Sequence, residues 1–257
     1  MTIHHTVHGD GPSTVVLLHG GTGDSQTYWA AQVEELSKNF RLLLMDHRGF
    51  GRPDSLEEFS IAGCASDVVA LLDEYSVPSA DLVGLSLGGA IAIQTALARP
   101  DRVGRLVLAD TFSSVRTERF QRFIDYALIA SLREGGHDLM FNINLIFAHG
   151  ERYLADNRDS FSEAMTAWRE TEVDRYVKSL QAIRDWDVDS RLGEITAPSL
   201  VIWGSDDIEV PRVYAERLAA GLPNAILTVI PEAGHKSCAD APLAFNKLVR
   251  TFLLPSG

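Results

Sequence analysis

The sequence predicts an α/β protein with a mostly parallel, doubly wound sheet, and three observations point to this fold class. Six short apolar runs occur along the 257 residues, most of them followed by a glycine. Their apolarity is continuous instead of alternating, which is typical of strands that helices cover on both faces. Stretches with helical periodicity separate most of the runs, and strands that alternate with helices favour a parallel sheet.

The individual elements follow from these patterns in chain order. Strands are expected at residues 14–21, 41–49, 80–86, 105–111, 199–207 and 225–235, where the runs read TVVLLHGG, RLLLMDHRG, ADLVGLS, RLVLADT, SLVIWGSDD and AILTVIPEAGH. Helices are expected at residues 27–38, 66–75, 88–98, 213–221 and 243–253. The strand at 80–86 runs directly into the helix at 88–98, so a sharp turn must lie between them.

The alternation of strands and helices stops between residues 112 and 196. This stretch keeps helical periodicity but contains no strand candidate, and the strands resume after Pro198. We therefore predict one domain, with a core formed by residues 1–111 and 197–257. Residues 112–196 are expected to form a helical insertion that covers the carboxyl edge of the sheet as a cap.

Composition narrows the classes of function. The chain is 46% hydrophobic and carries a formal net charge of −12, which disfavours nucleic acid and anionic membrane surfaces as partners. No apolar stretch approaches the roughly 20 residues of a membrane span, and the histidine-containing N-terminus does not resemble a signal peptide. Two distant cysteines, Cys64 and Cys238, form no metal-ligand or disulfide pattern, so a cytoplasmic protein without metal or organic cofactor is expected. The oligomeric state is left open.

Ser86 lies in a G-x-S-x-G pattern, GLSLG, between a predicted buried strand and a predicted helix. A serine at such a turn adopts strained angles, and the strain lifts its hydroxyl above the sheet. Side chains at Gly84 and Gly88 would collide with each other or with the backbone. In this context the pattern predicts that Ser86 is a catalytic nucleophile, whereas a plain turn would be the alternative.

The base that activates this serine is predicted to be His235. It stands alone among the eight histidines in following the last predicted strand, where a short loop can bring it over a neighbouring strand end. His19 also ends a strand, but its glycine neighbours favour a structural role. A histidine base predicts a pH–rate profile that rises near neutrality.

The acid that orients His235 is predicted to be Asp207, which follows the strand SLVIWG. Asp110, one strand earlier, is a rival, and so is Asp206, which is more often a solvated loop carboxylate. The two oxyanion donors are predicted to be the backbone N–H groups of Gly21, in the turn HGGTG, and of Leu87, at the start of the helix.

With these residues in place, the chain resembles the α/β-hydrolase superfamily, with serine as nucleophile. HGGTG, DHRGFGRPDS, GLSLGG, GSDD and GH occur in the order of that family and extend over nearly the whole chain. The resemblance is strongest to small carboxylesterases and 3-oxoadipate enol-lactonases. It implies that residues 112–196 roof the acyl pocket, and that Asp46 and Arg48 have structural roles. GHKSCADAP departs from the family pattern at Lys236 and Cys238.

The predicted function is hydrolysis of a small-molecule carboxylic ester or lactone through an acyl-enzyme on Ser86. Two alternatives keep the same triad: cleavage of a carbon–carbon bond in a ring-fission diketone, and a perhydrolase side activity in which peroxide replaces water. A third alternative is a small-molecule receptor with little turnover, for which an apolar patch on the cap, such as FNINLIF, would be the sign.

Overall fold

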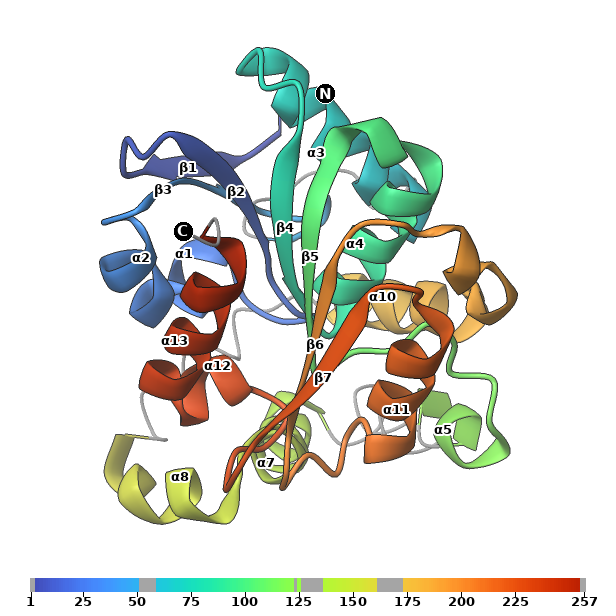
Figure 1. Cartoon of the computed structure of the whole chain (residues 1–257). Coiled ribbons are helices and arrows are strands. Elements are labelled where there is room, and N and C mark those ends of the chain that lie inside the picture. The colour runs from blue at the N-terminus through green and yellow to red at the C-terminus, as the bar shows by residue number, and fades with distance from the viewer. Residues whose placement is uncertain (1–2, 51–58, 123, 126–135, 161–172, 255–257) are drawn as a thin grey trace.

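A seven-stranded sheet forms the centre of the molecule (Figure 1). The computed structural model describes residues 3–50, 59–122, 124–125, 136–160 and 173–254. In spatial order the sheet reads β1-β3-β2-β4-β5-β6-β7. All neighbouring strands are parallel except the edge pair β1 and β3, which is antiparallel. The strands are β1 His5–His8, β2 Ser13–Leu18, β3 Phe40–Met45, β4 Ala80–Leu85, β5 Val103–Ala109, β6 Ser199–Gly204 and β7 Ala225–Ile230.

Helices connect the strands and cover the sheet on both sides (Figure 1). In the core they are α1 Ser25–Tyr28, α2 Ala30–Leu36, α3 Ile61–Glu74, α4 Leu87–Ala98, α11 Arg212–Gly221, α12 Ser237–Asp240 and α13 Pro242–Leu253. A short 3-10 helix, η1 (Pro100–Arg102), precedes β5. Helices α2 and α13 pack together on one face, whereas α3 and α4 pack together on the other. The predicted doubly wound α/β fold is confirmed.

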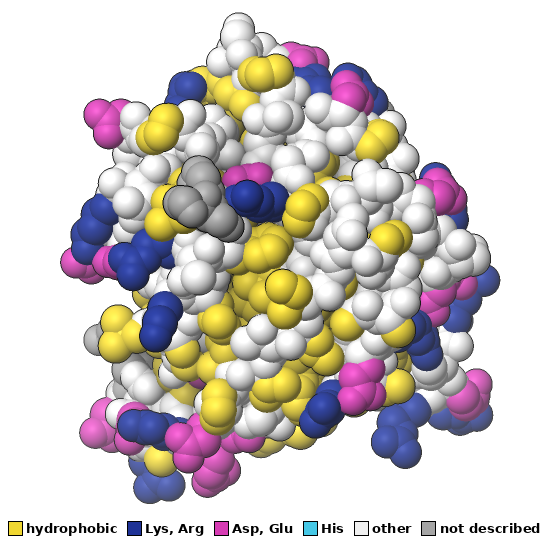
Figure 2. Space-filling model, in the orientation of Figure 1, with side chains coloured by type: hydrophobic (Ala, Val, Ile, Leu, Met, Phe, Trp, Pro, Cys, Tyr) yellow, Lys and Arg dark blue, Asp and Glu magenta, His cyan; other side chains and the backbone are white. Residues whose placement is uncertain are grey.

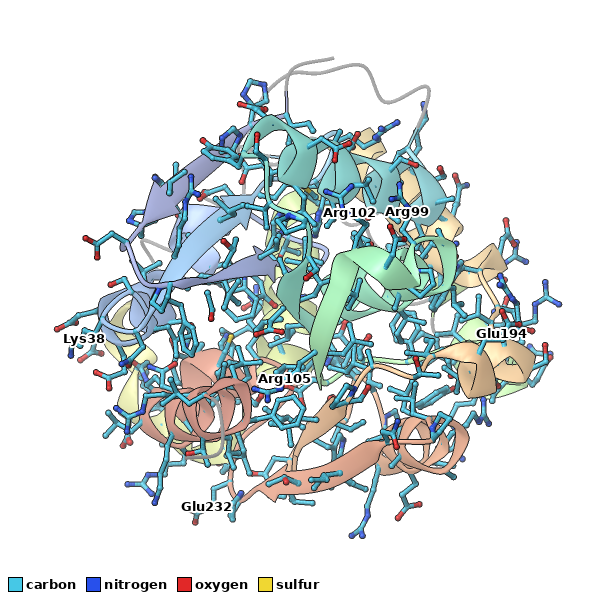
Figure 3. The ribbon with its side chains drawn as sticks, turned by 45° about the horizontal axis from the view of Figure 1, so that its top comes forward. Lys38, Arg99, Arg102, Arg105, Glu194 and Glu232 are labelled. Carbon is cyan, nitrogen blue, oxygen red and sulfur yellow. The ribbon has the colours of Figure 1, made fainter. Side chains whose placement is uncertain are left out.

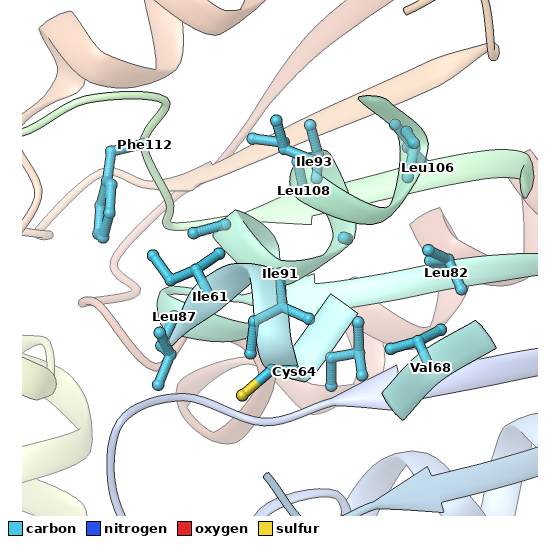
Figure 4. Packing of buried hydrophobic residues seen from close by; sticks show 14 of the residues in the cluster. Ile61, Cys64, Val68, Leu82, Leu87, Ile91, Ile93, Leu106, Leu108 and Phe112 are labelled. Atoms are coloured by element: carbon cyan, nitrogen blue, oxygen red, sulfur yellow. The ribbon is translucent and has the colours of Figure 1, made fainter. Parts of the chain in front are cut away.

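Two separate apolar cores explain why the strands are continuously apolar. Along β2, Val16 and Leu18 belong to the core beneath α3 and α4, whereas Val15 and Leu17 belong to the core beneath α2 and α13. The first of these cores includes Leu87, Ile91, Ile61 and Cys64, seen together in Figure 4. Because both faces of the strand are buried from Val15 to Leu18, all four of these positions are apolar.

Two arginine side chains at the amino-terminal edge of the sheet donate hydrogen bonds to nearby backbone carbonyls. Arg102 donates to the carbonyls of Val77 and Pro78 at 2.9 and 2.7 Å, just before β4 begins. Arg105 on β5 donates to the carbonyl of Leu253 at 2.6 Å, at the end of α13, and both arginines are labelled in Figure 3. Carbonyls at the end of a helix lack partners within the helix, so Arg105 satisfies one of them.

Several boundaries differ from the sequence-based prediction. The edge strand β1 was not predicted as a strand. The helix expected at 27–38 is interrupted at Trp29, which separates α1 from α2. Helix α3 begins at Ile61 instead of residue 66, because the Ser60 hydroxyl accepts from Gly63 N–H and caps it. Strand β7 ends at Ile230 because the chain turns at Glu232, where φ is 58°.

In the described part of residues 112–196, the regular elements are helices, joined by loops and one β-bridge. It contains α5 Glu118–Arg122, α7 Gly136–Ala148, α8 Glu151–Asp156 and α10 Val173–Asp185, with 3-10 helices η3 Arg158–Ser160 and η4 Asp189–Glu194. The bridge pairs Ser114 with Asp187, at the two ends of the insertion. Its division from the core and its role as a cap remain predictions. None of the helices within the described ranges is long and apolar enough to cross a membrane.

Candidate active site

The candidate nucleophile occupies the sharp turn between β4 and α4. Ser86 has φ 54° and ψ −119°, a strained combination for a residue with a side chain, and such strain costs about 1–3 kcal/mol. Its backbone is fixed on both sides. Ser86 N–H donates to the carbonyl of Ala109 at 3.0 Å, and Thr111 Oγ1 donates to the Ser86 carbonyl at 2.6 Å. The neighbouring strand β5 therefore holds the turn in its strained form.

The glycines around Ser86 leave the space that the turn needs. A Cβ atom on Gly84 would lie against the carbonyl oxygen of Gly88, and a Cβ on Gly88 would lie against that of Leu18. Both contacts are with backbone, which cannot move aside without disturbing the sheet. The steric reason predicted for these two glycines is confirmed.

His235 and Asp207 form a buried pair at the carboxyl ends of β7 and β6. His235 Nδ1 and Asp207 Oδ2 are 3.0 Å apart, and each residue is 4% exposed. The other carboxylate oxygen, Asp207 Oδ1, accepts from Val210 N–H at 2.8 Å. This bond holds the carboxylate in place, so it can fix the imidazole with Nδ1 protonated and Nε2 free.

The two rival acids are hydrogen-bonded to other groups than the His235 ring. Asp110 accepts from Gly204 N–H at 2.8 Å and from Ser237 N–H at 3.3 Å, so it supports the loops beside the site. Burial and the charge of Asp207 raise the pKa of Asp110 to about 8. The Asp206 carboxylate accepts from Ser205 Oγ at 2.9 Å. Of the three acids, Asp207 is the one that the structure places on the His235 ring.

Nε2 of His235 faces a carboxylate that the sequence analysis did not single out. Glu209 Oε1 lies 3.9 Å from it, and the Ser86 hydroxyl forms no hydrogen bond with any described residue. Catalytic hydrogen bonds are often longer before substrate binds. The only signal for Glu209 in the sequence is a third acid two residues before Pro211, in DDIEVP.

Carboxylates around the ring change its protonation. Burial lowers the pKa of His235, but the charges of Glu209 and Asp207 outweigh burial and raise the pKa to about 10. The expectation of a pH–rate rise near neutrality counted only Asp207 beside the ring, whereas the charges of Glu209 and Asp110 also raise the pKa of His235.

His19 shapes the turn that carries the predicted oxyanion donor Gly21. The His19 ring is fully buried and stacks on His47 with centroids 4.0 Å apart. Its Nε2 accepts from His47 N–H at 3.3 Å, which places the proton on Nδ1, and Nδ1 donates to the Gly20 carbonyl at 2.7 Å. Burial lowers the pKa of His19 to about 4 and keeps the ring neutral. By holding the Gly20 carbonyl, the ring fixes the peptide plane to which Gly21 N–H belongs.

The second predicted donor, Leu87 N–H, is the first amide of α4. Amides in the first turn of a helix have no acceptor within the helix, and the positive end of the helix dipole favours negative charge there. Within the described chain, neither Leu87 N–H nor Gly21 N–H donates to a protein acceptor. Both are therefore available to a ligand.

Other residues that the sequence analysis named surround the site. Lys236 Nζ lies over the Tyr28 ring, 5.6 Å from its centroid, and burial lowers its pKa. Cys238 is 1% exposed, and burial raises the pKa of its thiol, which suits a packing residue. Asp46 accepts from Ser25 N–H at 2.8 Å, so it has a structural partner in α1. Arg48 donates to Asp67 on α3 at 2.7 Å, which is likewise a structural contact.

The described residues contain no candidate set of metal ligands. In the ranges that the structure describes, no three His, Cys, Asp or Glu side chains are grouped so that they could hold a metal ion. His235 and Asp207 make the contact expected of a base and the acid that orients it.

Comparisons with known proteins agree with this architecture. The sequence profile of the alpha/beta hydrolase fold matches residues 13–242. A protein of Variovorax paradoxus, provisionally named carbamate hydrolase RutD, is 33% identical, with 98% of this chain and 96% of that protein aligned. The 2-hydroxy-6-oxononadienedioate/2-hydroxy-6-oxononatrienedioate hydrolase of Cupriavidus pinatubonensis is 35% identical over 98% of this chain and 90% of its own length.

A solved structure gives the same picture. The enol-lactonase from Burkholderia xenovorans superposes with a TM-score of 0.87 at 25% identity, covering 98% of this chain and 96% of the other. The three similar proteins act, by their names, on three different kinds of bond. The similarity therefore supports the fold and a hydrolytic reaction, but it does not identify the substrate.

Proposed function

The chain belongs to the alpha/beta hydrolase family, and from that membership we propose that it cleaves a small-molecule carboxylic ester or lactone through an acyl-enzyme on Ser86. The observation that carries this proposal is the pairing of His235 with Asp207 at 3.0 Å, after β7 and β6, at the same carboxyl edge of the parallel sheet as the strained serine after β4. The enol-lactonase neighbour supports the choice of an ester bond.

In the proposed reaction, Ser86 Oγ attacks the carbonyl carbon while His235 Nε2 takes the hydroxyl proton. Asp207 stabilises the imidazolium that forms, and the N–H groups of Gly21 and Leu87 hold the negative oxygen. His235 then gives its proton to the leaving alcohol, and the acyl group stays on Ser86. Water repeats the sequence, so that one ester and one water become one alcohol and one acid.

Cleavage of a carbon–carbon bond is a second candidate, because the relative of Cupriavidus pinatubonensis is named as a hydrolase of 2-hydroxy-6-oxononadienedioate, a hydroxy-keto diacid without an ester bond. The same residues would serve it, with a carbanion leaving in place of an alkoxide. A true carbon–carbon hydrolase is expected to prefer the ring-fission diketone over simple esters by orders of magnitude.

One experiment tests both candidates. The protein is treated with a fluorophosphonate and the modified residue is mapped by mass spectrometry, while p-nitrophenyl esters, lactones and a ring-fission diketone are assayed on the same sample. We expect label on Ser86, loss of label in Ser86→Ala, and turnover of esters or lactones. Labelling elsewhere, or turnover that survives in Ser86→Ala, would contradict the proposal.

A further inference from the structure

Glu209 has a largely buried side chain, although glutamate side chains are usually exposed to solvent. It lies in the loop after β6, where Ile208 is 55% exposed and the Glu209 side chain is only 16% exposed. An apolar residue therefore faces solvent while the acid beside it turns inward. Glutamate is rarely buried unless something pairs with it.

The carboxylate of Glu209 is not fully satisfied by the protein. Oε1 lies 3.9 Å from His235 Nε2, which is too far for a hydrogen bond. Oε2 is buried and has no hydrogen-bond partner among the described residues. Burial raises the pKa of Glu209, as expected for a carboxylate that has lost its water. A buried acceptor of this kind is costly until a donor reaches it.

The position of this acceptor tells which part of a substrate would reach it. In the proposed reaction, His235 Nε2 protonates the leaving group, so the leaving atom must come within about 3 Å of Nε2. Glu209 lies near this same nitrogen, whereas Asp207 holds the other ring nitrogen, Nδ1. Substituents on the leaving group therefore fall within its reach.

Resting on the proposed function, we infer that Glu209 determines specificity by accepting a hydrogen bond from a protonated amine carried on the leaving alcohol. The favoured substrates are esters of amino alcohols, whose ammonium N–H supplies the hydrogen-bond donor that Oε2 lacks and a positive charge beside Glu209 when His235 is neutral. Charge-assisted hydrogen bonds of this kind are the strong ones, and burial limits their screening by salt.

A competing role would be electrostatic action on His235 alone. The groups that face His235 are Asp207 and Glu209 from the β6 loop, Asp110 after β5, Lys236 beside it and His149 from the insertion. If Glu209 acted only on the ring, its removal would change the rate of every ester equally. If it binds the substrate, its removal changes the ratio between a cationic ester and a neutral one.

The test uses two acetate esters of the same shape. The leaving alcohol is 2-(dimethylamino)ethanol in one and 3-methylbutanol in the other, so that an ammonium replaces a CH group. We expect kcat/KM of the unchanged protein to favour the cationic ester by roughly ten- to a hundredfold. Glu209→Gln should lose most of this preference, and Glu209→Asp should keep part of it. Glu232→Gln, which removes an exposed acid nearby, should keep all of it.

The outcomes separate the inference from the proposed function. Equal kcat/KM for the two esters in the unchanged protein, a preference that persists in Glu209→Gln, or equal slowing of both esters would overturn the role of Glu209. Absence of turnover for the cationic ester, while p-nitrophenyl acetate is hydrolysed, would overturn it as well. Failure of p-nitrophenyl acetate turnover together with no label on Ser86 would refute the proposed function instead.

A pH profile adds an independent readout. The ammonium offsets the negative charge of Glu209 beside His235, which lowers the pKa of His235 in the complex with the cationic ester. The ring therefore loses its proton and can act as a base at lower pH in that complex. We expect the rising limb of kcat to lie at lower pH for the cationic ester than for the neutral one. In Glu209→Gln the two limbs should coincide. Coincident limbs in the unchanged protein would count against the inference.

Discussion

At the scale of single residues, the strain at Ser86 has a measurable effect on stability. Its φ of 54° is one that glycine adopts freely, whereas alanine keeps the strain. We expect Ser86→Gly to raise the free energy of unfolding by about 1 kcal/mol relative to Ser86→Ala, with both variants inactive. Urea unfolding of the two variants measures the difference. Equal stability would mean that the turn carries no strain energy.

The contact to the His235 ring predicts which acid matters for catalysis. Asp207 meets Nδ1 at 3.0 Å, whereas Asp110 bonds to the backbone of Gly204 and Ser237. Asp207→Asn should lower kcat by roughly four orders of magnitude, because the amide fixes the wrong tautomer. Asp110→Asn should lower it far less. Steady-state kinetics on the ester panel compares them, and an equal loss in both would refute the assignment of roles.

The acids around His235 also set the pH dependence. With the pKa of His235 raised to about 10, the ring is protonated at neutral pH and becomes a base as pH rises. We expect kcat/KM for a neutral ester to keep rising between about pH 8 and 10. A plateau already reached at neutral pH would contradict this. The same shift stabilises the fold below the unfolded pKa of about 6.5, and that contribution is lost as pH rises through about 10.

At the scale of elements, Asp240 on α12 joins the insertion to the loop that carries His235. Its side chain is fully buried and accepts from Gly150 N–H at 2.7 Å, Gly234 N–H at 2.8 Å and His149 Nδ1 at 2.6 Å. Gly150 lies between α7 and α8, and Gly234 immediately precedes His235. One carboxylate thus aligns two segments that are far apart in sequence.

Loss of this carboxylate is expected to be costly. Asp240→Ala leaves two backbone amides unpaired in the interior, and we expect it to lower the free energy of unfolding by about 3 kcal/mol. It should also lower kcat, because the His235 loop loses its anchor. Asp156→Ala, which removes an exposed acid from α8, is the matched control and should change neither quantity appreciably. Thermal unfolding and ester kinetics check both, and a change below about 1 kcal/mol would show that Asp240 is dispensable.

The elements also show where sequence patterns were sufficient. The buried strands were predicted, because continuous apolarity marks a strand that is covered on both faces. Strand β1 was not predicted, because His5 and His8 are polar and only partly buried at the antiparallel edge. The sequence motif and the order of residues along the chain were enough to predict Ser86, His235 and Asp207 as site residues. The placement of Glu209 beside His235 depends on the direction in which one loop side chain points. No local pattern encodes that direction.

At the scale of the whole molecule, the β7 edge of the sheet exposes apolar side chains. Hydrophobic side chains gather near the middle of one face, between α13 and α11 (Figure 2). The edge strand β7 lies there, and its Ile226 and Val229 are 60% and 37% exposed. The neighbouring strand β6 is buried along its whole length.

Two valines in these neighbouring strands provide a matched test of how much side-chain burial contributes to the free energy of unfolding. Val201 on β6 is 1% exposed. We expect Val201→Ala to cost about 2 kcal/mol of unfolding free energy, because it removes two buried methyl groups and leaves a cavity. Val229→Ala should stay within about 0.5 kcal/mol of the unchanged protein. Equal losses in urea unfolding would mean that β7 is covered in solution.

The bridge between Ser114 and Asp187 has a consequence for the evolution of such chains. The insertion departs from the core and rejoins it at adjacent points, where Val188 N–H also donates to the Ser113 carbonyl at 2.9 Å. The intervening segment can therefore be lengthened, shortened or exchanged by recombination without displacing a strand. Under the predicted role of residues 112–196 as a cap, such an exchange would change the substrate preference and leave Ser86, His235 and Asp207 in place.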